Sequence, residues 1–270
     1  ATAKHFPGHG DVESDSHYTL PMIAHSRTRL DSLELFPFQR LVDEGLAAVM
    51  VAHLEVPALD STKGQPSTLS RYVVSDLLEE QIGFRGLVFT DALNMKGVAN
   101  ADKPGEIELR AILAGNDVML FPQDPVKAIE RIRKAIDENE LDRAVIDHKC
   151  LKVLRAKEWA GLNRMRPVEV NGLTSDLNTM RAKQLRRDLY GRALTVLNDH
   201  KNILPITDLQ KQRVASVVIG DSLGNVFQRS LQRYADVATF RCDKSIRRDS
   251  LNSLLRKLEP FDRVIVSVHG

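Results

Sequence analysis

Three of the eight histidines of the chain lie close to its start, among carboxylates and turn-forming residues. The segment runs from Lys4-His5-Phe6-Pro7-Gly8-His9-Gly10 to Asp15-Ser16-His17. Its glycines allow sharp turns and close approach of the backbone to a ligand, and its proline restricts the backbone. A packed core does not need this composition, so we interpret the segment as an active-site loop.

Asp15 and His17 are two residues apart, a spacing that on a loop lets the carboxylate contact one ring nitrogen of the imidazole. The carboxylate then fixes the tautomer and stabilises the cation, while the other ring nitrogen remains available. Such a pair transfers protons near neutral pH. We therefore expect His17, assisted by Asp15, to act as a general acid/base.

Other ionisable residues stand where apolar runs end. The run at 87–90 leads into Asp91, the run at 46–52 leads into His53, and Lys4 and His5 close a short strand. Parallel α/β folds bind ligands at the carboxyl ends of their strands. Asp91 is thus a candidate nucleophile or stabiliser of positive charge, and Lys4 and His5 are candidate hydrogen-bond donors to hydroxyl groups.

The first part of the chain alternates apolar runs with amphipathic helices, which favours a parallel sheet covered by helices. Strands are predicted at 46–53, 87–91 and 117–122, and helices at 70–78 and 106–114, with helical periodicity again from 125 to 161. Residues 163–177 lack periodicity, which predicts a linker. A second α/β unit is expected beyond it, with a helix at 185–194 and strands at 194–197, 214–220 and 264–268.

The composition is that of an ordinary globular protein, with 270 residues, a net charge of +2 and 43% hydrophobic residues. This length allows two domains. Charge and hydropathy indicate neither nucleic-acid binding nor a membrane span of ~20 apolar residues. Cys150 and Cys242 predict no disulfide framework, and the opening at Ala1 without an apolar leader leads us to expect an internal piece of a longer protein.

A metal centre is the alternative for the histidine-rich loop. Zinc accepts the ligand types offered there by His5, His9, His17, Asp11 and Asp15. A His-x-x-x-His pair presents both imidazoles on one face only in a helix, which Pro7 and Gly8 exclude. We therefore expect no metal and no other cofactor, and a purely structural role for His25.

The motif Lys4-His5-Phe6-Pro7-Gly8-His9-Gly10 with Asp15-Ser16-His17 resembles the long motif of β-N-acetylhexosaminidases of glycoside hydrolase family 3, the NagZ-like enzymes. The segment Phe89-Thr90-Asp91-Ala92-Leu93-Asn94-Met95-Lys96-Gly97 is similar to the family's nucleophile segment. Ala92 stands where the β-glucosidase branch of the family usually has tryptophan. The resemblance is strong over residues 1–125 and weaker in the second unit.

This resemblance implies a retaining exo-β-N-acetylglucosaminidase that acts on a small carbohydrate, either a muropeptide or a chitooligosaccharide. Asp91 would be the nucleophile that attacks the anomeric carbon, and His17 with Asp15 would be the general acid/base. Lys4 and His5 would bind sugar hydroxyl groups. An imidazole in the acid/base role avoids repulsion between two carboxylates, because it is neutral or cationic.

The resemblance also implies an α/β fold with the C-terminal half of a (β/α)8 TIM barrel at 1–162, a linker at 163–184 and the start of an α/β sandwich domain at 185–270. The front half of the barrel would lie outside the chain. Four strands leave two open edges, so we expect little or no hydrolytic activity from the chain alone. Relatives with a second domain are often exported, which favours a periplasmic or cell-surface location over a cytoplasmic one.

Three other functions remain open at this point. A β-N-acetylglucosaminide phosphorylase of the same family would also suit a histidine, which does not repel phosphate as a carboxylate does. A non-catalytic carbohydrate-binding piece and a metal-dependent hydrolase are the others. The sequence predicts no nucleic-acid partner and leaves the oligomeric state open.

Overall fold

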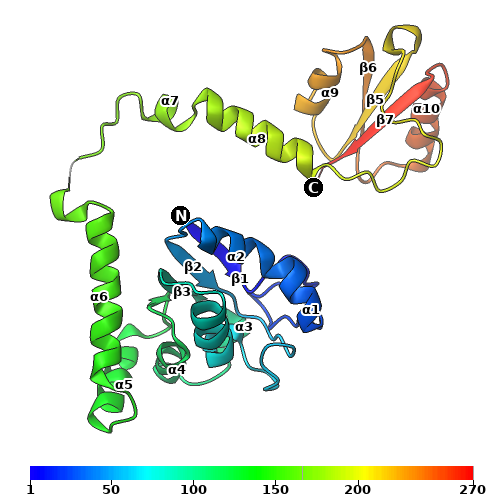
Figure 1. Cartoon of the computed structure of the whole chain (residues 1–270). Coiled ribbons are helices and arrows are strands. Elements are labelled where there is room, and N and C mark those ends of the chain that lie inside the picture. Colours follow the sequence, from blue (N-terminus) through cyan, green and yellow to red (C-terminus); the bar gives the residue numbers. More distant parts are fainter. Residues whose placement is uncertain (166, 270) are drawn as a thin grey trace. The chain divides into compact units, whose positions relative to one another are not determined.

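The computed structural model describes residues 1–165 and 167–269 of the chain. These residues form two units, Ala1–Val168 and Glu169–Gly270, each of which is described by itself (Figure 1). Arg166, inside the predicted linker, and Gly270, the last residue of the predicted second domain, lie outside the described residues. None of the described helices combines the length and apolar character that a membrane span requires.

The first unit is built on a four-stranded sheet in which every pair of neighbouring strands is parallel. The strands follow sequence order across the sheet, β1-β2-β3-β4. Parallel neighbours joined by helical connections define an α/β fold, as predicted. The strands are β1 (Thr2–Phe6), β2 (Ala48–Val51), β3 (Leu87–Ala92) and β4 (Val118–Leu120).

Helices fill the connections between these strands and continue beyond β4 (Figure 1). Those predicted at 70–78 and 106–114 are confirmed, the first as a π-helix. In chain order the helices are α1 (Arg27–Arg29), the π-helix η1 (Leu30–Glu34), α2 (Phe36–Asp43), the 3-10 helix η2 (Ser67–Leu69), the π-helix η3 (Tyr72–Gln81), α3 (Lys96–Ala99), α4 (Glu106–Ala114), α5 (Pro125–Asp137), α6 (Arg143–Trp159) and the 3-10 helix η4 (Leu162–Arg164).

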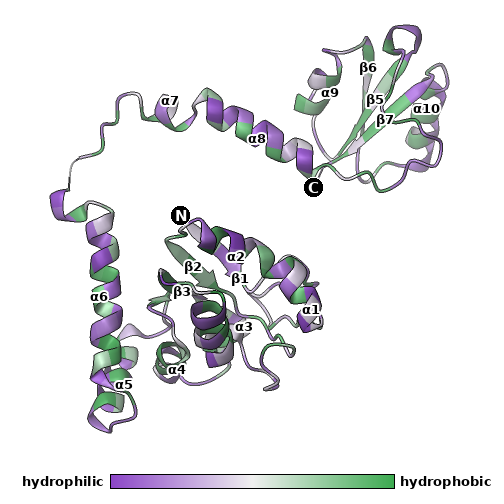
Figure 2. Cartoon of the chain, viewed as in Figure 1, coloured by the Kyte–Doolittle hydropathy of each residue, from purple (hydrophilic) through white to green (hydrophobic). Residues whose placement is uncertain are grey.

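The central strands of the first unit, β2 and β3, are largely apolar, and helices cover them. Val49, Val51 and Val88 are fully buried and share one core with Val74 and Leu78 of η3. Burial of one such aliphatic side chain contributes about 1.5–3 kcal/mol to stability. Figure 2 shows β2 and β3 as hydrophobic ribbons beside helices of mixed polarity. The sheet is therefore a firm base for the loops at its edges.

Local side-chain contacts set where the helices begin and end. The hydroxyl of Ser70 accepts the backbone N–H of Val73 at the start of η3, as a capping serine does. The carboxylate of Asp142 accepts the N–H of Ala144 at the start of α6. Gly115, with φ of 123°, ends α4 in a conformation that other residues rarely adopt.

A buried ion cluster joins α6 to the amino ends of the strands. The Asp117 carboxylate is 1% exposed and lies 2.6 Å from Lys152 Nζ and 3.5 Å from Lys149 Nζ. It also accepts the backbone N–H of Val88 at the start of β3. Burial lowers the pKa of the Lys149 ammonium, and the negative charge of Asp117 opposes this effect. The opposite, carboxyl ends of the strands carry the residues of the predicted site.

The second unit contains a smaller parallel sheet with the order β6-β5-β7. The strands predicted at 214–220 and 264–268 are confirmed as β5 and β7, and β6 lies on the other side of β5. Its elements are α7 (Leu173–Leu177), α8 (Met180–Ala193), the 3-10 helix η5 (Leu209–Lys211), β5 (Val214–Ile219), α9 (Val226–Leu231), β6 (Val237–Cys242), α10 (Arg248–Leu258) and β7 (Arg263–Val268).

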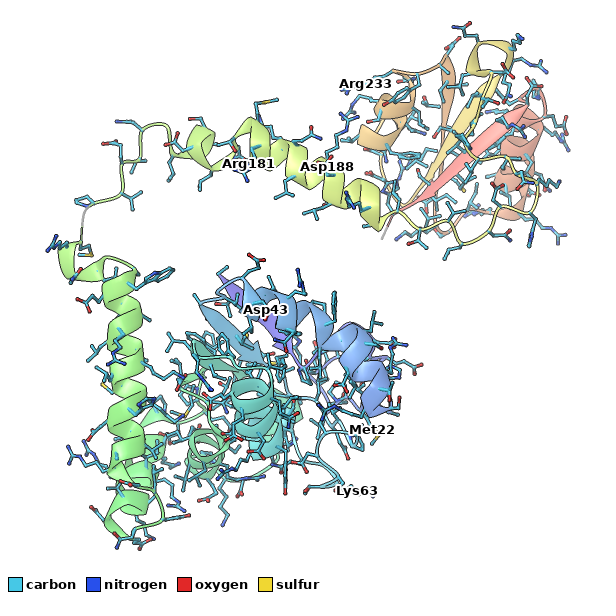
Figure 3. The ribbon with its side chains drawn as sticks, in the orientation of Figure 1. Met22, Asp43, Lys63, Arg181, Asp188 and Arg233 are labelled. Atoms are coloured by element: carbon cyan, nitrogen blue, oxygen red, sulfur yellow. The ribbon has the colours of Figure 1, made fainter. Side chains whose placement is uncertain are left out.

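Several predictions at the start of the second unit are wrong. Residues 194–197 form no strand, and Leu194 and Leu197 are 83% and 93% exposed. An apolar run becomes a strand only where a neighbouring strand pairs with it, and none of the described strands does so here. The aperiodic segment contains the short helix α7. The helix predicted at 185–194 is confirmed as α8, which begins earlier, at Met180. Figure 3 shows Arg181 and Asp188 extending from α8.

Candidate functional site

All five residues predicted to carry chemistry line one cavity of about 560 Å³. The cavity lies at the carboxyl ends of β1 and β3, where strand-end side chains meet the loop that follows β1. This edge of a parallel sheet is where such folds place their ligands. The lining residues are Lys4, His5, His9, Gly10, Asp15, Ser16, His17 and Asp91.

Asp91 is the anchored carboxylate of the cavity. It lies within β3, and its side chain is 14% exposed. Asp91 Oδ1 accepts the backbone N–H of Ala92 at 2.8 Å, which fixes the carboxylate, and Oδ2 lies 3.7 Å from Nε2 of His5. An aspartate fixed in this way suits a nucleophile, because little side-chain freedom is lost when it reacts.

His5 lies on β1 and faces Asp91 of β3 across the strand between them, β2. Burial lowers the pKa of the His5 imidazole, and the negative charge of Asp91 opposes this effect. The imidazole is therefore neutral at pH 7, with one N–H to donate. A neutral donor beside the Asp91 carboxylate is suited to hold a hydroxyl group without neutralising that carboxylate.

His53, which the sequence also placed at a strand end, does not line the cavity. It is fully buried, and its Nε2 donates to the carbonyl of Ala92 at 3.0 Å. Its Nδ1 lies 2.7 Å from the Thr68 hydroxyl. Burial lowers the pKa of His53, so the ring is neutral. His53 thus holds the end of β3 that carries Asp91, a positioning role that the sequence does not reveal.

Asp15 and His17 form the pair that their spacing predicts. Asp15 Oδ1 accepts from Nδ1 of His17 at 2.6 Å and from the backbone N–H of His17 at 2.9 Å. The backbone N–H and then the imidazole lower the pKa of the Asp15 carboxyl. Nε2 of His17 has no partner among the described residues, so it is available to exchange a proton with a ligand.

The loop between β1 and the Asp15–His17 pair is held by its own polar residues. His9 Nε2 lies 3.0 Å from the hydroxyl of Ser16, which is 4% exposed. The rings of His5 and His9 meet edge to face with centroids 5.8 Å apart. These contacts keep the loop folded against the cavity.

The loop that bears His17 packs closely on α3, the short helix after β3. The backbone N–H of Lys96 donates to the carbonyl of His17 at 3.3 Å. A Cβ on Gly97 would lie 2.6 Å from the carbonyl oxygen of Thr19 and 2.9 Å from that of Ser16. Only glycine permits this approach, which brings the loops after β1 and β3 together.

Comparison with known families gives one match across most of the first unit. A family model described as the glycosyl hydrolase family 3 N terminal domain matches residues 1–156. A β-hexosaminidase of Chromobacterium violaceum is 42% identical over 125 residues, which cover 46% of this chain and 34% of the relative. The β-hexosaminidase A of Pseudoalteromonas piscicida is 28% identical over 225 residues, or 76% of this chain and 37% of the relative.

A solved structure is similar over both units. The family 3 β-N-acetylglucosaminidase of a Paenibacillus strain has a TM-score of 0.73 and 27% sequence identity, and the match covers 99% of this chain and 52% of that structure. The chain spans about a third of the length of the two curated relatives and about half of the solved chain. The cavity residues all lie inside the segment that the family model matches.

Proposed function

Because the chain belongs to glycosyl hydrolase family 3, we propose that it forms part of a retaining exo-β-N-acetylglucosaminidase. The substrate is a muropeptide or chitooligosaccharide with a terminal β-linked N-acetylglucosamine. The observation that carries this proposal is that Asp91, held by a backbone N–H, and His17, paired with Asp15, line the same cavity. The names of the β-hexosaminidase relatives support the same substrate class.

In the first step, Asp91 acts as the nucleophile. Its carboxylate oxygen attacks the anomeric carbon while the bond from that carbon to the glycosidic oxygen breaks. His17, protonated at Nε2, gives its proton to the departing oxygen, and the aglycone leaves as an alcohol. The sugar is then held as an ester of Asp91, and His17 is neutral.

In the second step, His17 acts as the base. Its Nε2 takes a proton from water, the water oxygen attacks the anomeric carbon, and the bond to Asp91 breaks. Two displacements at one carbon return the original β configuration. Asp91 ends as a carboxylate and His17 as a cation, so the site is ready for another substrate.

Asp15, His5 and Lys4 support these steps without forming bonds to the anomeric carbon. Asp15 orients the His17 ring and stabilises its cationic form through the 2.6 Å contact at Nδ1. Lys4 and His5 line the same cavity and donate hydrogen bonds to sugar hydroxyl groups. The neutral state of His5 keeps Asp91 free of a proton-sharing partner.

We propose that the first unit is the C-terminal half of a (β/α)8 barrel. Its parallel sheet in sequence order, with helices in the connections, supports this assignment. Residues 1–162 form the half barrel, 163–184 the linker and 185–270 the start of an α/β sandwich domain. The parallel sheet of the second unit is consistent with that domain.

Trapping of the covalent intermediate tests the proposal. The protein that carries this chain is incubated with 5-fluoro-N-acetylglucosaminyl fluoride, which slows hydrolysis of the ester, and its peptides are analysed by mass spectrometry. We expect the sugar mass on the peptide with Asp91. Asp91→Asn is expected to prevent labelling and to lower kcat for an aryl β-N-acetylglucosaminide by at least about 10⁴-fold.

The matched control is Asp102→Asn, at an exposed carboxylate that pairs with Arg110. This variant should label and turn over as the wild type does. Labelling of another residue, or full activity in Asp91→Asn, contradicts the proposal. Release of a sugar 1-phosphate when phosphate is added would replace hydrolysis with phosphorolysis at the same site.

A further inference from the structure

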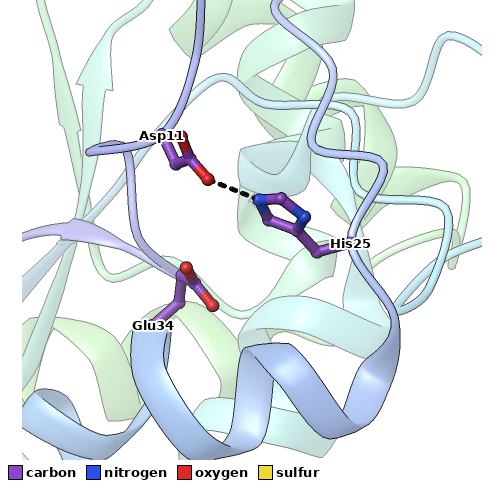
Figure 4. A group of neighbouring side chains, drawn as sticks. All are labelled: Asp11, His25 and Glu34. Atoms are coloured by element: carbon purple, nitrogen blue, oxygen red, sulfur yellow. Dashed lines mark hydrogen bonds and ion pairs between the residues drawn. The ribbon is translucent and has the colours of Figure 1, made fainter.

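A second group of ionisable residues lies outside the cavity lining. Asp11 belongs to the loop after β1, His25 precedes α1, and Glu34 is the last residue of η1. Each offers one ligand atom, and these atoms lie within 4.8 Å of one another. Figure 4 shows Asp11 and His25 facing each other, with Glu34 directed toward the space beside them.

The Glu34 carboxylate carries an unused ligand atom. Its side chain is 9% exposed, and Oε2 is buried without a hydrogen-bond partner among the residues that the structure describes. Removing a charged oxygen from water without a partner is costly, so native proteins satisfy such atoms with hydrogen bonds, water or ions. The atom therefore points to a ligand that this group of residues receives.

The charges of the group favour a cation. Asp11 and Glu34 contribute two negative charges, and Arg29 lies 3.2 Å from Glu34 Oε1 and 3.6 Å from Asp11 Oδ2. An imidazole that binds a metal is neutral, so the two carboxylates and Arg29 leave one negative charge. Asp11 is 60% exposed and His25 is 31% exposed, so an ion can enter from solvent.

We propose that Asp11, His25 and Glu34 bind a Zn²⁺ ion, with water as the fourth ligand. One imidazole nitrogen and two carboxylate oxygens form a ligand set that suits zinc better than calcium, because calcium takes oxygen ligands alone. Tetrahedral zinc with bonds of about 2.0–2.1 Å needs ligand atoms roughly 3.4 Å apart. Asp11 Oδ2 and His25 Nε2 are now 2.7 Å apart, so a small separation of this pair admits the ion.

Zinc at this position would fasten the loop that leads to His17. Asp11 lies on that loop, whereas His25 and Glu34 belong to the segment that follows it. Gly8 packs directly on the same segment, because a Cβ on Gly8 would lie 2.8 Å from Cβ of Glu34. The site is structural, and it does not depend on the proposed hydrolytic function.

Calorimetric titration of the chain with ZnCl₂ tests this proposal. We expect one tight site per chain and a higher Tm in the presence of zinc. His25→Ala and Glu34→Gln should weaken zinc binding by about tenfold or more. Asp11→Asn, at a position that is 60% exposed, should do the same, and it keeps the test valid if the Glu34 variant misfolds.

Two control variants distinguish this site from others. Asp31→Asn removes an exposed carboxylate of η1 that pairs with Arg27, and His17→Ala removes the histidine of the cavity. Both should retain the tight site. The proposal is overturned if wild-type chain does not bind zinc, if His25→Ala binds it unchanged, or if only His17→Ala loses it.

Discussion

The Asp15–His17 pair combines tight pairing with exposure to solvent. The two side chains are 56% and 69% exposed, yet Oδ1 of Asp15 receives two hydrogen bonds from His17. Because these bonds favour the ionised form, the pKa of Asp15 lies below its ordinary value of 3.8. The Asp15 side chain therefore stays a carboxylate throughout the pH range in which a glycosidase works.

The sign of this shift predicts how the loop responds to acid. A carboxyl whose pKa is lowered in the folded state stabilises the fold above its unfolded pKa, and this stabilisation is lost as the pH falls through the folded pKa. We expect the Asp15 carboxyl to titrate with a midpoint below 3.8 in an NMR titration. A midpoint at or above that value would contradict the pairing.

Asp15→Asn should lower kcat/KM for an aryl β-N-acetylglucosaminide by about 10²- to 10⁴-fold in the protein that carries this chain. The loss should shrink for aryl leaving groups of low pKa, because they depart without a proton. Glu13→Gln, at an exposed carboxylate of the same loop, is the control and should leave kcat/KM unchanged for every leaving group. An equal loss for every leaving group would indicate a structural role for Asp15.

Among the elements, α3 packs closely against the loop that bears His17. Gly97→Ala would place a Cβ 2.6 Å from the carbonyl oxygen of Thr19, so α3 and the loop must separate. We expect a loss of about 1–3 kcal/mol in the free energy of unfolding, measured with urea, together with lower kcat/KM. Unchanged stability and turnover would show that this close approach is not required.

Gly191→Ala provides the contrast. Gly191 lies inside α8, and no atom lies within 4 Å of the Cβ that the substitution adds. Alanine in an exposed helix is favoured over glycine by about 0.5–1 kcal/mol, so this variant should gain stability where Gly97→Ala loses it.

The elements of the first unit were largely predictable because their apolar runs are also their buried strands. Helix α4 begins and ends where its periodicity indicates. The prediction of a strand at 194–197 is wrong because a strand needs a neighbouring strand to pair with, and the four residues alone do not show whether one is present. β6 was not predicted, since only two of its six residues are buried and its alternation is weak.

The same distinction holds for the site. Lys4, His5 and Asp91 were predictable because strand ends of a parallel sheet share one edge, and Asp15 with His17 because their contact is local in sequence. The grouping of Asp11, His25 and Glu34 was not predicted. These three side chains come together only when η1 folds back toward the loop after β1, and the spacing of the residues in the sequence does not indicate this.

At the scale of the whole chain, the sheet of the first unit is open on both sides. Among the described strands, β1 and β4 each pair with one neighbour, so each presents unpaired backbone groups. The Asp15–His17 pair is also largely exposed to solvent. Water around the charge that develops in the transition state weakens the stabilisation that the protein gives to that charge. We therefore expect little or no release of aryl product when the purified chain is assayed alone. Turnover by the monomeric chain would contradict this expectation.

The outer strand of the second unit bears on how the chain behaves in solution. Val264, Val266 and Val268 alternate along β7 and are 42%, 54% and 74% exposed. An edge strand with an apolar stripe promotes association with other chains, and a net charge of +2 gives little electrostatic repulsion between chains. We therefore expect this strip of valines to promote association between chains at high protein concentration.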